Sequence, residues 1–273
     1  MRIRISFALA AAAAVAACAR SGPPAATPAP VITIHAHDYA YTAPDTVPAG
    51  MVTIHLINDG PDLHHANIVR LDSGKTAADL DAALAGKGPL PAWAVLLGGP
   101  NAPAPGDSAT AIMALTPGHY DILCFVDMPG GIPHFARGMR HPFVVTASTA
   151  NATPPVADVS LTLVDYGFEF SKPLTRGPHV VAVRDSSSQP HEIEIVKLAP
   201  GKTGEDFLKW MADPKGPPPG TPMGGSAMQA PGTTDYIRVD LQPGTYLYIC
   251  FVPDARDGKP HFMHGMMHTQ VIE

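Results

Sequence analysis

Short runs of β-branched and other apolar residues, separated by turn formers, dominate the chain after residue 30. The runs have the length and composition of β-strands, and turn formers such as Pro48-Ala49-Gly50 and Asn58-Asp59-Gly60-Pro61 lie between them. The pattern predicts strands over residues 31–35, 51–57, 64–71, 109–115, 120–126, 142–145, 159–164, 179–184, 191–198, 234–241, 246–252 and 269–272.

Two short helices are expected among these strands. Thr76 with Asp79, and Thr203 with Asp206, have the spacing of a capping box, and each pair precedes a short helix-forming run. Many strands, few helices and frequent Gly and Pro (25 and 31 residues) predict an all-β fold, and we expect β-sandwiches.

The same order of residues occurs twice along the chain, 126 or 127 positions apart. The matched pairs are His64 and His191, Cys124 and Cys250, His134 and His261, and Met139 and Met266. The triplets Gly74-Lys75-Thr76 and Gly201-Lys202-Thr203 match as well. We therefore predict two copies of one domain, residues 31–147 and 156–273, joined by a linker over residues 148–155. Each copy is long enough to bury a core of its own.

Each copy contains the same potential metal donors. A His opens one predicted strand, a Cys lies within a later strand, and a His and a Met follow that Cys. Two imidazoles and a thiolate in a trigonal plane, with a weak axial thioether, form a blue-copper site, and the soft sulfur donors favour copper.

The loop that carries these donors resembles that of a known family. It is Cys-x9-His-x4-Met in the first copy and Cys-x10-His-x4-Met in the second, with Gly before Met in both. Each copy resembles a cupredoxin domain, and the loop is most similar to the long version in copper nitrite reductases. The resemblance implies two tandem Greek-key β-sandwiches, each with one short inserted helix, and up to two mononuclear copper sites. The copper ligands that it implies are His64, Cys124, His134, Met139, His191, Cys250, His261 and Met266. His65 is an alternative to His64 as the first His ligand. When the two copies are aligned so that Leu71 matches Leu198, however, His64 and not His65 matches His191.

The residues beside each Cys differ from those of the copper enzymes in this family. In nitrite reductases and multicopper oxidases a His flanks the blue-copper Cys and leads electrons to a catalytic copper. Here Cys124 lies between Leu123 and Phe125, and Cys250 lies between Ile249 and Phe251. We therefore expect no oxidase or nitrite reductase activity.

The first 30 residues have the pattern of an export signal. Arg2 and Arg4 precede an apolar run over residues 5–17, which is too short to span a bilayer. The run ends in Val15-Ala16-Ala17-Cys18, which resembles the bacterial lipoprotein cleavage box. We predict a signal peptide over residues 1–17, lipidation of Cys18 and a Pro/Ala tether to residue 30. Because Ala19 is not the Asp that favours retention in the inner membrane, we expect an outer-membrane lipoprotein that faces the periplasm or the cell surface.

The net charge argues against one class of partner, and the cysteine positions argue against a disulfide. The formal net charge is −6, which argues against nucleic-acid binding. An exported protein often forms disulfides, but Cys124 and Cys250 occupy equivalent positions in separate copies, which argues against a bond between them.

Three functional hypotheses follow from these patterns. The first is electron transfer through type 1 copper sites to a redox partner protein in the cell envelope, with the membrane contacted only through the lipid anchor. The second is copper storage or transfer between a copper donor and an acceptor, helped by the Met/His-rich segment over residues 263–268. The third is a metal-free binding module of the envelope.

Overall fold

The computed structural model describes residues 28–72, 74–85, 90–128, 130–149 and 152–273. The predicted signal peptide, Cys18 and the tether up to residue 27 lie outside the described residues. Neither of the two α-helices in the described part of the chain is long and apolar enough to cross a membrane.

The first half of the chain is built almost entirely of strands. Its elements are β1 (Val31–His37), β2 (Ala40–Thr42), β3 (Thr46–Pro48), β4 (Gly50–Asn58), β5 (Asn67–Leu71), α1 (Ala77–Ala85), β6 (Ala94–Leu96), β7 (Ser108–Leu115), β8 (Gly118–Leu123), β9 (Asp127–Met128), β10 (Ile132–Pro133), a 3-10 helix (His134–Arg137) and β11 (Arg140–Thr146).

The second half repeats this order with fewer short strands. Its elements are β12 (Val159–Val164), β13 (Gly167–Phe170), β14 (Gly177–Asp185), β15 (His191–Leu198), α2 (Gly204–Ala212), β16 (Gly220–Gln229), β17 (Thr234–Leu241), β18 (Gly244–Ile249), a 3-10 helix (His261–His264) and β19 (Met267–Ile272).

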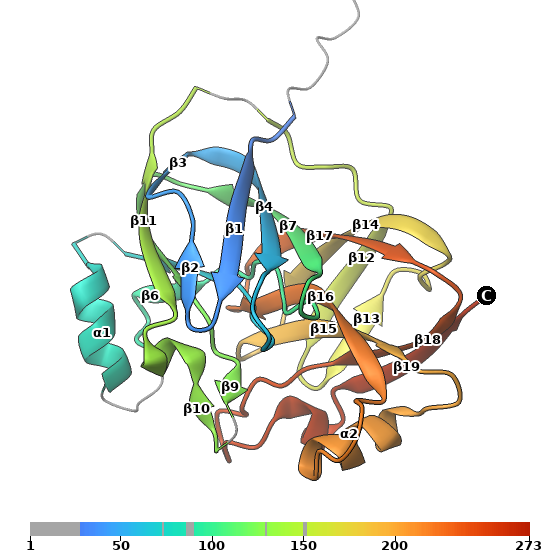
Figure 1. Cartoon of the computed structure of the whole chain (residues 1–273). Helices are drawn as coiled ribbons and strands as arrows, with labels where there is room; N and C mark the ends of the chain where they lie inside the picture. Colours follow the sequence, from blue (N-terminus) through green and yellow to red (C-terminus); the bar gives the residue numbers. More distant parts are fainter. Residues whose placement is uncertain (1–27, 73, 86–89, 129, 150–151) are drawn as a thin grey trace, which may run out of the picture.

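The two halves share one continuous sheet. This eight-stranded sheet has the order β13-β12-β14-β17-β7-β4-β1-β2, so each half contributes four neighbouring strands to it (Figure 1). A five-stranded sheet, β3-β11-β8-β5-β6, packs against the part from the first half, and a four-stranded sheet, β16-β15-β18-β19, packs against the part from the second half. Each half is therefore a β-sandwich with a core of its own between two layers.

Each core is made of side chains from both layers. In the first half Ile34 and Val52 from the shared sheet pack with Ile122 from the second layer. In the second half Leu161 and Val183 pack in the same way with buried residues of β15 and β18. Alternate positions along these strands are buried, as a two-layer sandwich requires.

The halves are related by an approximate two-fold axis. In the shared sheet Ala111 of β7 pairs with Ile237 of β17, and these two residues are repeat counterparts, 126 positions apart. A second antiparallel contact pairs Pro100 with Ser226, which are again counterparts. Residues that pair with their own counterparts lie next to the axis, so the interface resembles that of a symmetric dimer.

All twelve predicted strands and both predicted helices occur. The capping boxes are present: the backbone N–H of Asp79 donates to Thr76 Oγ1, and the same contact joins Asp206 to Thr203. Most of the strands differ from the prediction at one or both ends, and three of these differences concern candidate ligands. His64 lies three residues before β5, and each Cys directly follows β8 or β18 rather than lying within it.

Candidate metal centres

The first candidate centre, formed by His64, Cys124 and His134, is closed by the backbone of the loop after β8. The N–H of His134 donates to Val126 O (2.9 Å), and that of Phe135 donates to Cys124 O (2.9 Å). These bonds fold the loop back over the Cys. The 3-10 helix then ends at Gly138, whose φ of 94° favours glycine, and the chain turns to Met139.

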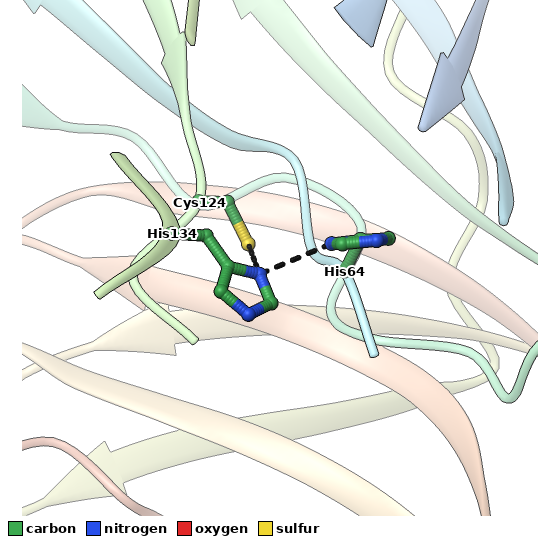
Figure 2. Close-up of side chains that lie close together, drawn as sticks. All are labelled: His64, Cys124 and His134. Carbon is green, nitrogen blue, oxygen red and sulfur yellow. Dashed lines mark hydrogen bonds between the residues drawn. The ribbon is translucent and has the colours of Figure 1, made fainter. Parts of the chain in front are cut away.

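The three donor atoms of the first centre lie within 4.8 Å of one another. His134 Nδ1 is 3.5 Å from Cys124 Sγ and 3.1 Å from His64 Nδ1 (Figure 2). All three side chains are buried. In Figure 2 the thiol and the His64 ring approach the same nitrogen of His134 from different sides.

A carboxylate determines which nitrogen of His64 faces the centre. Asp38 Oδ1 lies 2.6 Å from His64 Nε2, so Nε2 carries the proton that this bond requires. Nδ1 then has a free lone pair and faces the Nδ1 of His134. Carboxylates hold metal-binding imidazoles in this tautomer in many proteins.

The second candidate centre, formed by His191, Cys250 and His261, repeats this construction. Cys250 Sγ lies 3.5 Å from His261 Nδ1 and 3.9 Å from His191 Nδ1, and all three side chains are buried. Asp165 Oδ1 lies 3.2 Å from His191 Nε2, in the role of Asp38. The loop after Cys250 has the same backbone bonds, and its glycine, Gly265, has a φ of 102°.

Burial favours the neutral form of three imidazoles, those of His64, His134 and His261, and the protonated form of the metal-free thiols. It lowers the pKa of His64 and of His134, and it lowers the pKa of His261 to about 4. Burial also raises the pKa of the Cys124 thiol to about 11. The pKa of the Cys250 thiol is also raised well above its usual range, first by burial and then by the nearby Glu192 carboxyl. A metal ion that bound here would therefore displace a thiol proton.

The two methionines are buried next to the cysteines. Met139 and Met266 are fully buried and belong to the same core clusters as Cys124 and Cys250, respectively. The Cys124 N–H donates to Met139 O (3.3 Å), and the Cys250 N–H donates to Met266 O (3.2 Å). The backbone of each Met is thus fixed beside its Cys, and its thioether would supply a further soft donor to a bound copper ion.

His65 points away from the first centre. Its Nε2 accepts the N–H of Phe125 (2.8 Å), and its Nδ1 lies 3.3 Å from Asn101 Oδ1. The structure therefore places His64, and not His65, with Cys124 and His134.

Sequence reasoning missed four residues that support the imidazoles. These are Asp38 and Asp165, and the tyrosines that follow them. The Tyr39 ring lies edge-on at 4.8 Å from His134, and the Tyr166 ring lies edge-on at 5.5 Å from His261 (centroid distances). The dipeptide Asp-Tyr occurs at both positions, 127 residues apart, so the repeat itself contained the signal.

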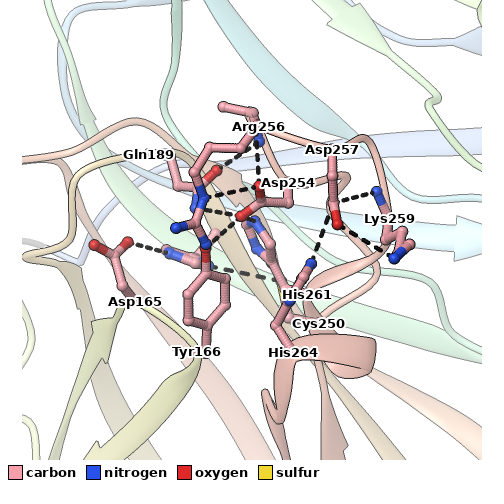
Figure 3. A network of polar contacts seen from close by, with 12 residues as sticks. Asp165, Tyr166, Gln189, Cys250, Asp254, Arg256, Asp257, Lys259, His261 and His264 are labelled. Atoms are coloured by element: carbon pink, nitrogen blue, oxygen red, sulfur yellow. Dashed lines mark hydrogen bonds and ion pairs between the residues drawn. The ribbon is translucent and has the colours of Figure 1, made fainter.

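A polar network covers the outer side of the second centre (Figure 3). Asp254 accepts hydrogen bonds from Tyr166 Oη, from Gln189 Nε2 (3.0 Å) and from the Arg256 N–H (2.8 Å), and these bonds hold the pKa of Asp254 well below its usual range. Its carboxylate lies 3.9 Å from His261 Nε2. Met128 occupies the corresponding place after Cys124, so the first centre lacks this charge.

Both donor sets fit a thiophilic transition metal. In the first centre His64 Nδ1 lies 3.1 Å from His134 Nδ1. Because His64 Nε2 carries the proton shared with Asp38, the Nδ1 of His64 has a free lone pair. In the second centre the ligand atoms of His191, Cys250 and His261 lie within 4.8 Å of one another. A cation held among the three donor atoms would accept their lone pairs, and two imidazoles with one thiolate are donors typical of copper and zinc.

No family model matches the chain, and no curated protein matches it in sequence. Solved structures are similar to it over one half or over both. Auracyanin from Roseiflexus castenholzii is 28% identical over 42% of this chain and 96% of its own, with a TM-score of 0.31. The Cu-containing nitrite reductase from Thermus scotoductus is 14% identical over 90% of this chain and 62% of its own (TM-score 0.28). The blue copper oxidase from Nitrosomonas europaea is 14% identical over 90% and 86% (TM-score 0.26).

The fold follows from the strand order and the loops of this chain. Each half has two layers of mixed parallel and antiparallel strands, with a His–Cys–His group and a buried Met at one end of the sandwich. Each half of the chain therefore has a cupredoxin-like fold.

Proposed function

We propose that the chain binds copper, one ion in each half, and transfers single electrons. The observation that carries this proposal is the buried His–Cys–His group, assembled twice from matching elements with a Met fixed beside each Cys. Copper supplies a one-electron couple when bound, and thiolate and thioether donors select it over harder ions.

The residues around each centre favour rapid electron exchange. The carboxylates of Asp38 and Asp165 hold the imidazoles in one orientation, and the tyrosine rings that follow them limit the access of water. Backbone bonds fix the ligand loop before metal enters. A rigid, dry site needs little rearrangement when the charge of the metal changes.

The proposal is a carrier and not an oxidase or a nitrite reductase. The residues beside each Cys support this distinction. Leu123 and Phe125 flank Cys124, and Ile249 and Phe251 flank Cys250. None of these side chains has a donor that would bind a second copper, so neither Cys is joined through a neighbour to a catalytic metal.

We also propose where the protein works. An exported lipoprotein attached through Cys18 would meet redox partner proteins in the cell envelope. Ile132 and Met263, each two positions from the second His of its centre, are exposed at 47% and 59%. They offer apolar contact to a partner close in sequence to the second His of each centre.

A copper titration of the chain from Ser21 onward tests the proposal. We expect an intense thiolate-to-copper absorption band that saturates at two equivalents, with an electron paramagnetic resonance spectrum typical of a blue-copper site. Cys124→Ala and Cys250→Ala should each remove one equivalent. Binding without the band would favour copper storage or transfer, and an absence of binding would favour a metal-free binding module.

A further inference from the structure

A chain of buried side chains crosses the interface between the two halves, from one ligand loop to the other. It begins at Phe125, the residue after Cys124, whose N–H donates to His65 Nε2 (2.8 Å). His65 Nδ1 then lies 3.3 Å from Asn101 Oδ1, in the segment between β6 and β7 that forms part of the interface.

The chain continues into the second half through the same carboxamide. Asn101 Nδ2 donates to Glu192 Oε2 (3.4 Å), and Glu192 Oε1 accepts the N–H of Phe251 (3.0 Å), the residue after Cys250. His65 and Glu192 are repeat counterparts and bind the equivalent backbone N–H in the two halves. Asn101 connects them.

The donors and acceptors along this path are mutually consistent. The Phe125 N–H can only donate, so His65 Nε2 accepts and Nδ1 carries the proton. That proton is donated to Asn101 Oδ1, which leaves the amide group of Asn101 to donate to Glu192. His65, Asn101 and Glu192 are 3%, 3% and 5% exposed, so water competes little for these four bonds.

We infer that His65, Asn101 and Glu192 form a bridge that carries electrons between the two metal centres. This inference rests on the proposed function, because it requires copper in both halves. The ligand cysteines are joined to the ends of the bridge by covalent bonds through Phe125 and Phe251. The only gaps in the path are therefore the four hydrogen bonds.

The transfer is a one-electron exchange within the protein. Cu(I) in one half becomes Cu(II), and Cu(II) in the other half becomes Cu(I). No bond is broken and no proton leaves the bridge, because each hydrogen remains on its donor. The protein would thus accept an electron at one surface and release it at another.

The bridge is tested first in the metal-free protein. We expect the Nδ1 proton of His65 to give a slowly exchanging signal in nuclear magnetic resonance spectra, and Asn101→Leu to abolish it. Asn67→Leu is the matched control, because Asn67 Nδ2 donates to Gly98 O and to Met228 O (both 2.9 Å) at the same interface but lies outside the bridge. A missing signal in the wild-type protein would overturn the inference whether or not copper binds.

Electron transfer is then followed in the copper-loaded protein. A reducing pulse of less than one electron per molecule is applied, and rapid-freeze electron paramagnetic resonance follows the redistribution of Cu(II), with the two single-Cys variants as reference spectra. We expect Asn101→Leu to slow the redistribution by roughly tenfold or more, because apolar contact replaces two polarised hydrogen bonds. Asn67→Leu should leave the rate unchanged, and both variants should keep the blue band at two equivalents. Equal rates in the wild-type protein and Asn101→Leu, or equal slowing in both variants, would refute the bridge. Loss of the blue band in the wild-type protein would refute the proposed function instead.

Discussion

The substitution Asp235→Asn should remove the contribution of one buried carboxyl to the pH dependence of stability. Asp235 of β17 is fully buried at the interface, and among the described residues no ion pair reaches it. It accepts hydrogen bonds from Gly99 N–H (3.1 Å), Ser226 Oγ (2.9 Å) and Gln229 Nε2 (2.7 Å). Burial outweighs these bonds and raises the pKa of the carboxyl to about 7.

The size of the effect follows from proton linkage. A carboxyl with a pKa raised from its ordinary value of about 4 to about 7 stabilises the fold fully below pH 4, and that contribution is lost as the pH rises through 7. The whole loss amounts to about 4 kcal/mol, of which about 3 kcal/mol falls between pH 5 and pH 8. Asparagine does not titrate, so the variant should lose about 3 kcal/mol less than the wild-type protein over that interval.

Urea unfolding of the metal-free protein at pH 5 and pH 8 measures this difference directly. Asp240→Asn is the control, because Asp240 is an exposed carboxylate on the same strand. The substitution is sterically mild: Gln229 Oε1 has no hydrogen-bond partner among the described residues, so a turned Gln229 amide can accept from the new asparagine. If wild-type and Asp235→Asn proteins lose stability in parallel between the two pH values, the reasoning is refuted.

Three further predictions concern the backbone, a helix and the metal ligands. Gly225→Ala should destabilise the fold by roughly 3 kcal/mol in urea unfolding, because its φ is 151° and a Cβ there would lie 2.0 Å from Ile193 O. Thr203→Ala should cost about 1 kcal/mol in the same assay through loss of the capping box, and an unchanged midpoint would contradict that. Asp38→Ala should weaken copper binding at the first centre roughly 10- to 100-fold in a competition titration and spare the second, and Asp165→Ala should do the reverse; equal effects on both centres would argue against tautomer control.

The strands of both sandwiches could be predicted because their signal is local. Alternation of apolar residues and Gly/Pro turns marks each strand, and the repeat placed the two halves in register. The repeat also favours His64 over His65, and the structure places His64 with Cys124 and His134.

The strand ends and β16 could not be predicted from local patterns. Cys124 and Cys250 lie beyond their strands because the ligand loop folds back and takes their backbone bonds. β16 has the sequence GTPMGGSAMQ, which lacks alternation, and it is held by β15 and by a segment of the other half that is distant in sequence. Its two adjacent glycines, Gly224 and Gly225, let the backbones approach closely, which no propensity scale shows.

The shared sheet was beyond sequence reasoning for a different reason. A repeat predicts two similar domains, but it does not predict which sheet edge of one domain pairs with which edge of the other. The strands that join the halves, β7 and β17, have the same pattern of apolar residues as other strands. Asp38 and Asp165 were detectable, because the Asp-Tyr pair is repeated, but their role depends on a contact across the loop to a ring 26 positions away.

The approximate symmetry bears on two polar residues of the interface, Asn101 and Asp235, whose repeat counterparts are alanines. Near a two-fold axis each residue meets its own counterpart, so identical side chains would compete for the same space. Asn101 is matched in the repeat by Ala227, and Asp235 by Ala109, so neither polar side chain has a polar counterpart in the other half. A dimer of identical domains would place two carboxamides where this chain has one, and neither would be free to accept from one half and donate to the other. Joining the two domains in one chain allowed the halves to diverge at these positions. The result is a short chain of hydrogen bonds across the interface in which His65 donates to Asn101 and Asn101 donates to Glu192.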